Sequence, residues 1–336
     1  MMKCSRRGET LISANDPGKK HSCNPPHQSQ AMRWCLRLGY DSLAWSLRRL
    51  YCPVDAKALV LEVGSGANPY PRANVLLDAY EDTLERHWEP LIAAGRPVVL
   101  GLGERLPFRD QAFDFVIASH VLEHSTDPAK FLGELRRVAK AGYIEVPDAF
   151  MERVNPYPFH RLEVTVRNNQ LLIRKKSDWR LDLELVELYE QRAKVVIARD
   201  TIRRFPFQFH VRFYWVGTID FTVLNPDVDA AWPTPPADPP VLASQHSTPS
   251  ARWRRRIVAL LRTLWSQRRR NKRLRLADVL ACPDCRSTRL SISLKSIRCQ
   301  TCEAEYPVRS GTPALYPTDH TASARMLLDG GSPACP

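Results

Sequence analysis

Four cysteines near the C-terminus have the spacing of metal ligands. Cys282, Cys285, Cys299 and Cys302 form two C-x-x-C turns separated by 13 residues. Four thiolates from two such turns close a tetrahedral site around Zn²⁺ with no open position, which makes the predicted site structural. Two disulfides are the alternative interpretation. The other five cysteines are scattered, and this pattern favours a reducing, cytoplasmic compartment.

A second segment that could bind a ligand is a glycine-rich loop that follows an apolar run. The loop contains Glu62, Gly64, Ser65 and Gly66. Glycines at a strand end permit a tight turn and let a ligand approach the backbone. A dinucleotide-binding loop would place a third glycine where this chain has Pro69, so NAD and FAD are disfavoured. An ordinary turn between a strand and a loop remains the alternative.

Two acidic residues flank this loop. Glu62 would repel a pyrophosphate, but it suits a ligand that carries a positive amino group. Asp78 ends the next apolar run, where a carboxylate can accept hydrogen bonds from ribose hydroxyls. An acid for the cationic end, glycines for close approach and an acid for the ribose together describe a site for S-adenosylmethionine.

The elements that must position these residues alternate between strand and helix. Short apolar runs predict strands at 58–63, 75–78, 97–101, 113–119 and 143–146. A helix is predicted over 128–139, and another from Tyr40 to Leu50. Continuous apolar strands separated by helices indicate a parallel sheet covered on both sides. We therefore expect an α/β, Rossmann-like, doubly wound and mostly parallel sheet.

The chain after residue 150 predicts further strands. The runs 162–166 and 171–175 flank Asn168-Asn169, which is a hairpin signal. The runs 210–216 and 219–224 flank Gly217 and are expected to form a second strand pair. A helix is expected around 181–198, between the two pairs.

Several motifs resemble the class I S-adenosylmethionine-dependent methyltransferases, closest to the broad subgroup with L-P-F and L-E-H signatures. The matching segments, within roughly 40–225, are L-E-V-G-S-G at 61–66, Asp78, L-P-F-R-D at 106–110, F-D-F-V-I-A-S-H-V-L-E-H at 113–124 and D-P-A-K-F-L-G-E-L-R-R-V-A-K-A-G at 127–142. The resemblance implies a seven-stranded sheet with the cofactor above the carboxyl ends of the strands. It places Gly64, Ser65 and Gly66 near the methionine part, Asp78 near the ribose, Gly103 and Glu104 near the adenine, and Ser119 and His120 on the methyl-transfer face.

Two departures from the family pattern affect the cofactor site. The usual third glycine is replaced by Asn68-Pro69, and only eleven residues separate Gly66 from Asp78. The first helix is therefore expected to be short or absent. Leu102 stands where an acid often follows the third strand, which weakens the expectation for adenine recognition.

His120 is the best candidate for a general base because it follows the fourth strand directly. A structural role is an equal alternative. His124 lies four residues on, and a structural hydrogen bond is the favoured reading for it. Asp148 and His160 follow the fifth strand and could reach the acceptor, although local bonding in a loop explains them as well. A base is needed only if the acceptor keeps a proton until it reacts.

The cysteine segment resembles the small zinc-ribbon protein that binds and activates several methyltransferases of translation components. The resemblance covers nearly all of 278–317 and implies an activator fused to its enzyme. We expect this ribbon to dock on the catalytic domain, with Leu280, Tyr306 and Leu315 as candidate contacts. Tyr306 and Leu315 could instead complete the core of the ribbon itself.

Basic residues are concentrated in one segment. Residues 252–275 hold ten Arg and one Lys with no acid, and the whole chain has a net charge of +13. Residues 253–265 fit an amphipathic helix. Three interpretations compete for this segment: a helix packed on the catalytic domain, a helix on an anionic membrane at its inner face, and a phosphate-binding arm for RNA. The start has no signal-peptide pattern.

The predicted domain organisation has six parts. These are a disordered N-terminus (1–30), a methyltransferase domain (31–225), a Pro-rich linker (226–250), the basic helix (251–276), the zinc ribbon (277–318) and a disordered tail (319–336). The expected function is methyl transfer to oxygen or nitrogen of a small molecule or of a lipid- or glycan-linked metabolite. RNA or a translation protein is the alternative acceptor, and a non-catalytic cofactor-binding protein is the third reading.

Overall fold

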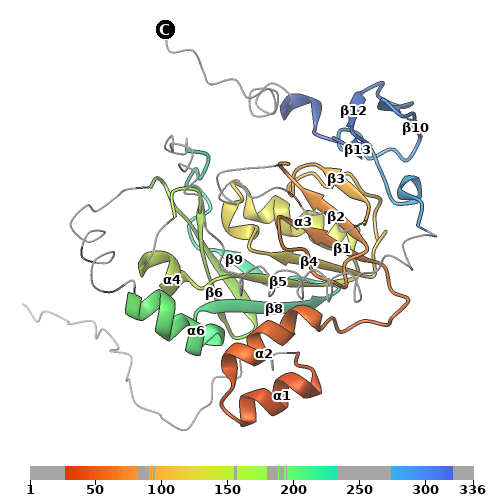
Figure 1. The fold of residues 1–336 in the computed structure, drawn as a ribbon. Coiled ribbons are helices and arrows are strands. Elements are labelled where there is room, and N and C mark those ends of the chain that lie inside the picture. The colour runs from red at the N-terminus through yellow and green to blue at the C-terminus, as the bar shows by residue number, and fades with distance from the viewer. Residues whose placement is uncertain are drawn as a thin grey trace, which may run out of the picture.

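The structure is a computed structural model that describes residues 27–81, 91, 93, 95–154, 157–179, 188, 193, 195–232 and 274–320 (Figure 1). A six-stranded sheet forms the centre of this part of the molecule, and a three-stranded and a four-stranded sheet accompany it. Among the described residues, no helix combines the length and the apolar character needed to cross a membrane.

The central sheet has the strand order β3-β2-β1-β4-β5-β8, in which only β8 is antiparallel. Its strands are β1 (Val60–Val63), β2 (Val75–Asp78), β3 (Val98–Leu100), β4 (Phe115–Ser119), β5 (Ala141–Pro147) and β8 (His210–Val216). The first five strands lie within or overlap the predicted apolar runs, and the expected Rossmann-like α/β fold is confirmed. The described residues form six strands of this sheet rather than the seven that the resemblance implied.

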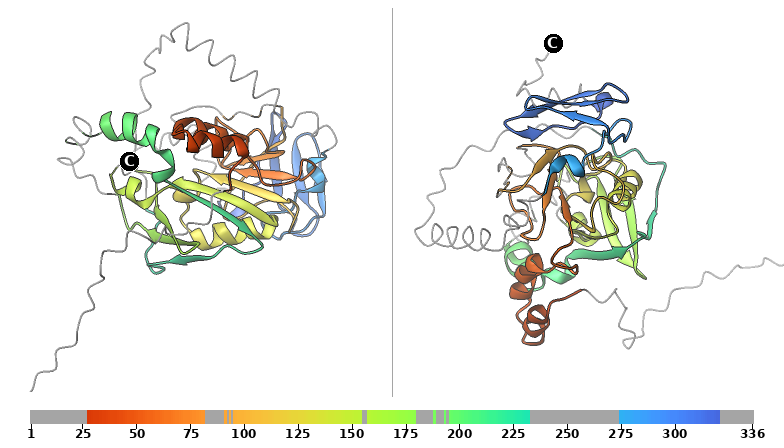
Figure 2. Two further views of the ribbon diagram at one scale, coloured as in Figure 1. Left: turned by 90° about the horizontal axis from the view of Figure 1, so that it is seen from below. Right: turned by 90° about the vertical axis from the view of Figure 1, so that its right-hand side faces the viewer.

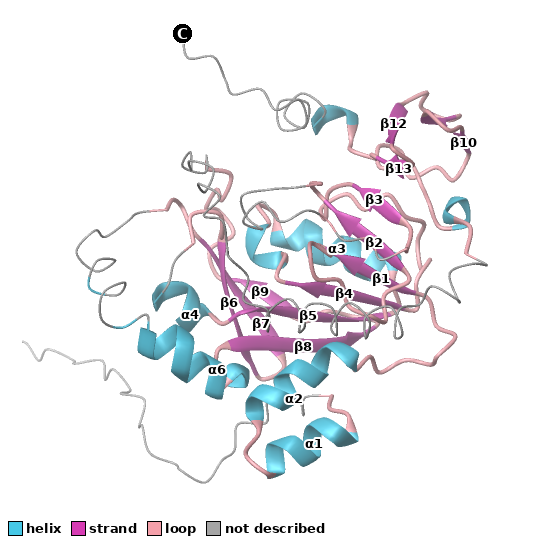
Figure 3. Ribbon diagram, in the orientation of Figure 1, coloured by secondary structure: helices cyan, strands magenta, loops and turns pink. Residues whose placement is uncertain are grey.

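Figure 3 shows α3 (Pro128–Val138) alongside the parallel strands and α1 (Gln30–Arg37) and α2 (Asp41–Leu47) next to β8. The helix α3 begins where the Asp127 side chain accepts a hydrogen bond from the backbone N–H of Lys130. Its apolar side packs into the main core through Phe131, Leu132, Leu135 and Val138. The 3₁₀ turn η1 (Arg48–Leu50) follows α2 directly.

The loop between β1 and β2 contains no helix. The expectation that the first helix is short or absent is therefore confirmed. Without that helix, the chain passes directly from the glycine loop to Tyr70 and Asn74, which are both buried. The backbone N–H of Asn74 donates to Val60 O at 2.7 Å, and this bond returns the chain to the sheet.

A smaller sheet contains β6 (Leu162–Arg167), β7 (Gln170–Lys175) and β9 (Phe221–Val223). Asn168 and Asn169 have φ of 49° and 63°, as a two-residue hairpin turn requires, so the predicted hairpin is confirmed. The expected pairing of 210–216 with 219–224 is wrong, since β8 pairs with β5 and β9 pairs with β7. The chain leaves the edge of the central sheet at Gly217, whose φ of +69° suits glycine.

The remaining elements surround the carboxyl end of β5. They are α4 (Ala149–Val154), the π-helical turn η5 (Val195–Thr201), α6 (Ile202–Arg204) and the 3₁₀ turn η6 (Pro206–Gln208). Most of the helix expected at 181–198 lies outside the described residues. Residues 1–26, 233–273 and 321–336 also lie outside the described residues. They contain nearly all of the two ends that we expect to be disordered, most of the expected linker and almost the whole expected basic helix.

The packed chain continues past the expected boundary at residue 225. The guanidinium of Arg161 donates to Ala230 O at 2.7 Å and to Trp232 O at 2.6 Å, and it lies 4.6 Å from the centre of the Trp232 ring. Ala230 is fully buried. Residues 226–232 therefore pack on the α/β part of the molecule, residues 27–225.

The C-terminal module lies beside the β3 edge of the central sheet (Figure 2). Its elements are η7 (Leu276–Asp278), β10 (Leu290–Ile292), β11 (Ser296–Cys299), β12 (Glu305–Arg309), β13 (Thr312–Pro313) and η8 (Thr318–His320). The four strands form one antiparallel sheet in sequence order.

Backbone hydrogen bonds join this module to the α/β part. Leu315 N donates to Leu100 O at 2.8 Å, Ala281 N donates to Pro107 O at 3.0 Å, and Arg109 N donates to Val279 O at 2.9 Å. A strand edge normally presents unpaired backbone groups, and here the module occupies part of that edge. Leu280 and Leu315 are buried at the junction, whereas Tyr306 lies inside the module, where its hydroxyl donates to Asp284.

Candidate active site and four-cysteine centre

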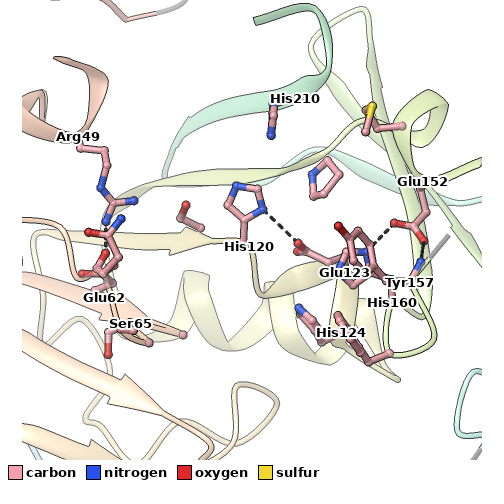
Figure 4. A pocket seen from close by; sticks show the side chains of 18 of the residues that line it. Arg49, Glu62, Ser65, His120, Glu123, His124, Glu152, Tyr157, His160 and His210 are labelled. Atoms are coloured by element: carbon pink, nitrogen blue, oxygen red, sulfur yellow. Dashed lines mark hydrogen bonds and ion pairs between the residues drawn. The ribbon is translucent and has the colours of Figure 1, made fainter. Parts of the chain in front are cut away.

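A cavity of about 550 Å³ opens at the carboxyl ends of β1 and β4 (Figure 4). The strand order reverses between these two neighbouring strands, and open α/β sheets bind their ligands at such a point. The volume lies within the usual range for small-molecule sites. The glycine loop lines one side of the cavity, and residues that follow β4 and β5 line the other.

The glycine loop folds tightly over the end of β2. Gly64 N and Ser65 N both donate to Leu77 O, at 2.9 and 3.2 Å. Gly64 has φ of +71°, and a Cβ there would lie 2.7 Å from the Cβ of Val121. Only glycine therefore fits at this position. The hydroxyl of Ser65 is buried in the cavity wall and has no hydrogen-bond partner within the described residues, which leaves it available to a ligand.

Glu62 lines the same side of the cavity and is 2% exposed. Its carboxylate accepts a hydrogen bond from Tyr70 N at 2.7 Å. Burial raises the pKa of Glu62 to about 7, although Arg49, the Tyr70 N–H and Arg96 oppose the rise. A cationic ligand group beside Glu62 would stabilise its charged form, because opposite charges lower a carboxyl pKa.

Three residues assigned by resemblance do not line the cavity: Asp78, Gly103 and Glu104. Asp78 lies behind the glycine loop, where its carboxylate accepts from Gly66 N at 2.8 Å and from Tyr80 N at 3.1 Å. Glu104 accepts from the Ser125 hydroxyl at 2.6 Å. The predicted residues that do line the cavity are Glu62, Gly64, Ser65, Gly66, Ser119, His120, His124 and His160.

His120 is the first residue after β4 and has φ of 55°. Such a left-handed conformation is uncommon for residues other than glycine and often marks a functional site. Its ring lies between two carboxylates, with Nδ1 3.5 Å from Glu123 Oε1 and Nε2 3.5 Å from Glu145 Oε1. Burial lowers the pKa of His120, but the two neighbouring carboxylates outweigh this effect and raise the pKa to about 9. The imidazole is therefore protonated at neutral pH.

Glu145, on β5, is fully buried beneath the cavity, and sequence reasoning missed it. It accepts hydrogen bonds from Arg48, from the Ser119 hydroxyl at 3.1 Å and from the Tyr143 hydroxyl. Burial opposes ionisation, but Arg48 and His120 hold the pKa of Glu145 well below its usual value. The signal in the sequence was an acid inside an apolar strand, which requires a buried cation as its partner.

Glu123, His124 and His160 meet at the other end of the cavity (Figure 4). One ligand atom from each lies within 4.8 Å of the others. Burial opposes the ionisation of Glu123, but His120, His124 and His160 lower its pKa to about 2. His160 Nδ1 lies 2.6 Å from Glu152 Oε2, and Lys176 also pairs with Glu152. Sequence reasoning noted His160 only by its place after the fifth strand and missed Glu123 and Glu152.

The four cysteines of the C-terminal module converge and carry no disulfide. Cys282 Sγ lies 3.6 Å from Cys302 Sγ, and Cys285 Sγ lies 3.5 Å from Cys299 Sγ. These separations are close to the edges of a tetrahedron whose metal–sulfur bonds are about 2.3 Å long. The donor set and its geometry therefore fit a closed four-thiolate metal site.

Comparison with known proteins agrees with this fold. Residues 61–144 match the Methyltransferase domain family. An uncharacterized methyltransferase of Mycobacterium sp. (strain JLS) is 28% identical in an alignment of 186 positions that covers 49% of this chain and 73% of that protein. The family match and this relative support S-adenosylmethionine-dependent methyl transfer in general.

Two further similarities are partial. An uncharacterized protein of Methanocaldococcus jannaschii is 44% identical over 48 residues, which are 14% of this chain and 23% of that protein. A structure of the complex between the Haloferax volcanii Trm112 methyltransferase activator and a methyltransferase matches with 14% identity and a TM-score of 0.33. That match covers 56% of this chain and 93% of the other.

Proposed function

We propose that the protein transfers a methyl group from S-adenosylmethionine to an oxygen, or a nitrogen, of a small molecule or of a lipid- or glycan-linked metabolite. One observation carries this proposal. A single cavity at the strand-order reversal joins the glycine loop to a second half lined by His120, Glu123 and His160. A cofactor and an acceptor can therefore lie next to each other in it.

The glycine-loop half has the groups that the cofactor needs. S-adenosylmethionine, when bound, supplies a methyl carbon made electrophilic by the positive sulfur. Glu62 would face the amino group of its methionine part, and the Ser65 hydroxyl would find the partner that it lacks within the described residues. Asp78 would contribute to cofactor binding in part by fixing the glycine loop, because its carboxylate accepts a hydrogen bond from Gly66 N. The residues present therefore fit the cofactor.

His120 would orient the acceptor. Methyl transfer between two bound groups depends mainly on alignment, which can supply about 7–11 kcal/mol in favourable cases. Glu123 and Glu145 hold the His120 ring from both sides, and its edge faces the cavity. A ring fixed in this way would present a positive charge at a fixed place in the cavity, which attracts an acceptor oxygen and sets its direction of approach. Its raised pKa favours this role over that of a general base at neutral pH.

We also propose that the four-cysteine centre holds one Zn²⁺ as a structural ion. Four thiolates leave no position open for a substrate. The module has few buried side chains of its own, and small modules of this kind depend on their metal for folding. The ion would thus maintain the surface that contacts β3.

RNA or a translation protein is the second candidate acceptor. It is supported by the contacts between the C-terminal module and the β3 edge, because the module resembles an activator of such enzymes. Isotope transfer from methyl-labelled cofactor to fractionated cell extract separates the candidates. Label in the metabolite or lipid fraction supports the first proposal, label in RNA or protein supports the second, and cofactor binding without any transfer supports a non-catalytic role.

Calorimetry on the full-length protein tests the cofactor site. Asp78→Asn is expected to raise the Kd for S-adenosylmethionine about 10- to 150-fold. The charged carboxylate holds the glycine loop through Gly66 N and Tyr80 N, and hydrogen bonds to a charged group contribute about 1.5–3 kcal/mol. Asp110→Asn is the matched control, since Asp110 is an exposed acid paired with Arg137 on the surface. An unchanged Kd in Asp78→Asn, or the same change in both variants, would contradict the proposal.

A further inference from the structure

Glu123 is a buried acid whose hydrogen-bonding capacity is not filled. Its side chain is 3% exposed, and neither carboxylate oxygen receives a hydrogen bond within the described residues. Within the described residues it forms an ion pair with His120 Nδ1 at 3.5 Å. Buried polar atoms in native proteins are almost always satisfied, so this carboxylate indicates a ligand that the described residues do not supply.

Two imidazoles stand beside this carboxylate. Ligand atoms of His124 and His160 lie within 4.8 Å of each other and of a Glu123 oxygen. The two rings are nearly perpendicular, with centres 4.8 Å apart. Glu123 and His124 come from the 3₁₀ turn η3 (Leu122–His124) after β4, and His160 comes from the loop before β6. Separate elements thus bring two nitrogens and one oxygen to a single point in the cavity wall.

Glu152 fixes the orientation of one of these imidazoles. Its Oε2 lies 2.6 Å from His160 Nδ1, which leaves Nε2 as the ring nitrogen free to meet a ligand. Glu152 is itself 3% exposed and paired with Lys176. Histidines that bind metals characteristically offer their second ring nitrogen to such a carboxylate. The arrangement of Glu152 and His160 therefore matches a metal ligand and the group that orients it.

We propose that Glu123, His124 and His160 bind one divalent transition-metal ion in the acceptor half of the cavity. Two imidazoles and one carboxylate suit zinc or iron(II), and three protein ligands leave coordination positions open. The three ligands and His120 all line the same cavity. The site is distinct from the four-cysteine centre in its ligands, in its location and in being accessible from the cavity.

The role of the ion rests on the proposed function. A hydroxyl coordinated to a divalent ion loses its proton more readily, because the ion stabilises the negative oxygen. The proton leaves to solvent, the oxygen forms a bond to the methyl carbon, and the carbon–sulfur bond breaks with both electrons remaining on sulfur. An acceptor with a hydroxyl group is therefore the class that this site selects over an amine.

Co²⁺ binding to the full-length, zinc-loaded protein tests the site. Nitrogen and oxygen ligands give Co²⁺ weak visible bands, whereas thiolates add intense charge-transfer absorption in the near ultraviolet. We expect one Co²⁺ per chain with weak bands only. Glu123→Gln should weaken this binding at least tenfold, and Glu152→Gln should weaken it about 10- to 100-fold by releasing His160.

Two controls accompany these variants. Glu163→Gln removes a carboxylate that pairs with Arg153 outside the cluster, and it should bind Co²⁺ like the wild type. Cys282→Ser should keep the weak bands, because its change lies in the other centre. If a variant fails to fold, paramagnetic broadening of the His124 and His160 ring signals in the wild-type protein gives the same information.

The possible outcomes distinguish a failure of the proposed metal site from a failure of the proposed function. No Co²⁺ uptake with weak bands, or uptake that Glu123→Gln leaves unchanged, would overturn the metal site. Cofactor binding measured by calorimetry in the same sample would leave the methyltransferase proposal standing in that case. Co²⁺ uptake that depends on Glu123, in a protein that binds no S-adenosylmethionine, would support the metal site and contradict the proposed function.

Discussion

Arg48 donates two hydrogen bonds to the carboxylate of Glu145, from Nε at 2.6 Å and from Nη2 at 2.7 Å. The arginine is 7% exposed and the glutamate is fully buried. This pair joins the 3₁₀ turn η1 to the middle of β5 beneath the cavity. Glu145 also contacts His120, so the N-terminal helices help to set the geometry of the active site.

Breaking this pair should destabilise the fold. Arg48→Met leaves the Glu145 carboxylate buried without its main cation, and such a change lowers the free energy of unfolding by about 3–5 kcal/mol. Denaturation with guanidinium chloride measures the effect. Arg136→Met, at an exposed position of α3, is the control and should change stability by less than about 0.5 kcal/mol. Equal stability of the two variants would show that the pair contributes nothing.

Cofactor binding should depend on pH through Glu62, whose pKa burial raises to about 7. The carboxyl is mostly protonated below this pH, and a cationic ligand group prefers the carboxylate. Binding must then release a proton, so the Kd should rise by up to about tenfold for each pH unit below 7 and level off above it. Calorimetry between pH 5.5 and 8.5 checks this.

A matched variant shows whether Glu62 is responsible. Glu62→Gln cannot titrate, so its Kd should lose most of the dependence between pH 6 and 7 while remaining weaker than that of the wild type at pH 8. Glu104→Gln, which changes an acid outside the cavity lining, should keep the wild-type profile. A wild-type Kd that is flat across this range would contradict the assignment of Glu62 to a cationic group.

Local patterns predicted the elements that depend on local interactions. The apolar run 75–78 forms β2, and the apolar residues at helical spacing within 128–139 form the buried side of α3. The partner of β8 could not be predicted in this way. Gly217 correctly marked a turn, but β8 pairs with β5, more than sixty residues earlier, because its apolar side chains complete the core there.

The buried charges of the site could not be predicted either, because they too depend on contacts between residues that are far apart in the sequence. Arg48 and Glu145 are 97 positions apart, so no motif links them. Glu123 stands between Leu122 and His124, and nothing in this order shows that its carboxylate is buried against His160. The glycine loop and the four cysteines were visible because each is defined by short spacings within the sequence.

Loss of one cysteine ligand should release the structural metal. Cys282→Ser should reduce the zinc content by one ion per chain, as measured by mass spectrometry of dialysed protein. Cys282 lies at the core of the module, where its sulfur contacts the Tyr306 hydroxyl at 2.9 Å. Cys35→Ser, on α1, is the control and should keep the wild-type zinc content. Unchanged zinc in Cys282→Ser would contradict the four-thiolate site.

Hydrogen exchange tests whether the C-terminal module stays docked. The amides of Arg109, Ala281 and Leu315 donate across the junction, and the amide of Cys299 donates within the module to Ala304. If the module stays on the β3 edge, all four should exchange slowly and at similar rates. A module that swings free would protect Cys299 and leave the other three fast, because amides of locally opened segments exchange through that opening.

A pair of leucines in the module extends this test to energetics. Leu315 is fully buried at the junction, whereas Leu294 is 94% exposed in the same module. Leu315→Ala should lower the free energy of unfolding by about 2–5 kcal/mol and speed exchange at Arg109 and Ala281, because it opens a cavity between two packed parts. Leu294→Ala should do neither. If Leu315→Ala destabilised the module but left exchange at Arg109 slow, Leu315 would serve the core of the module alone, and docking would rest on the backbone hydrogen bonds to Leu100 and Pro107.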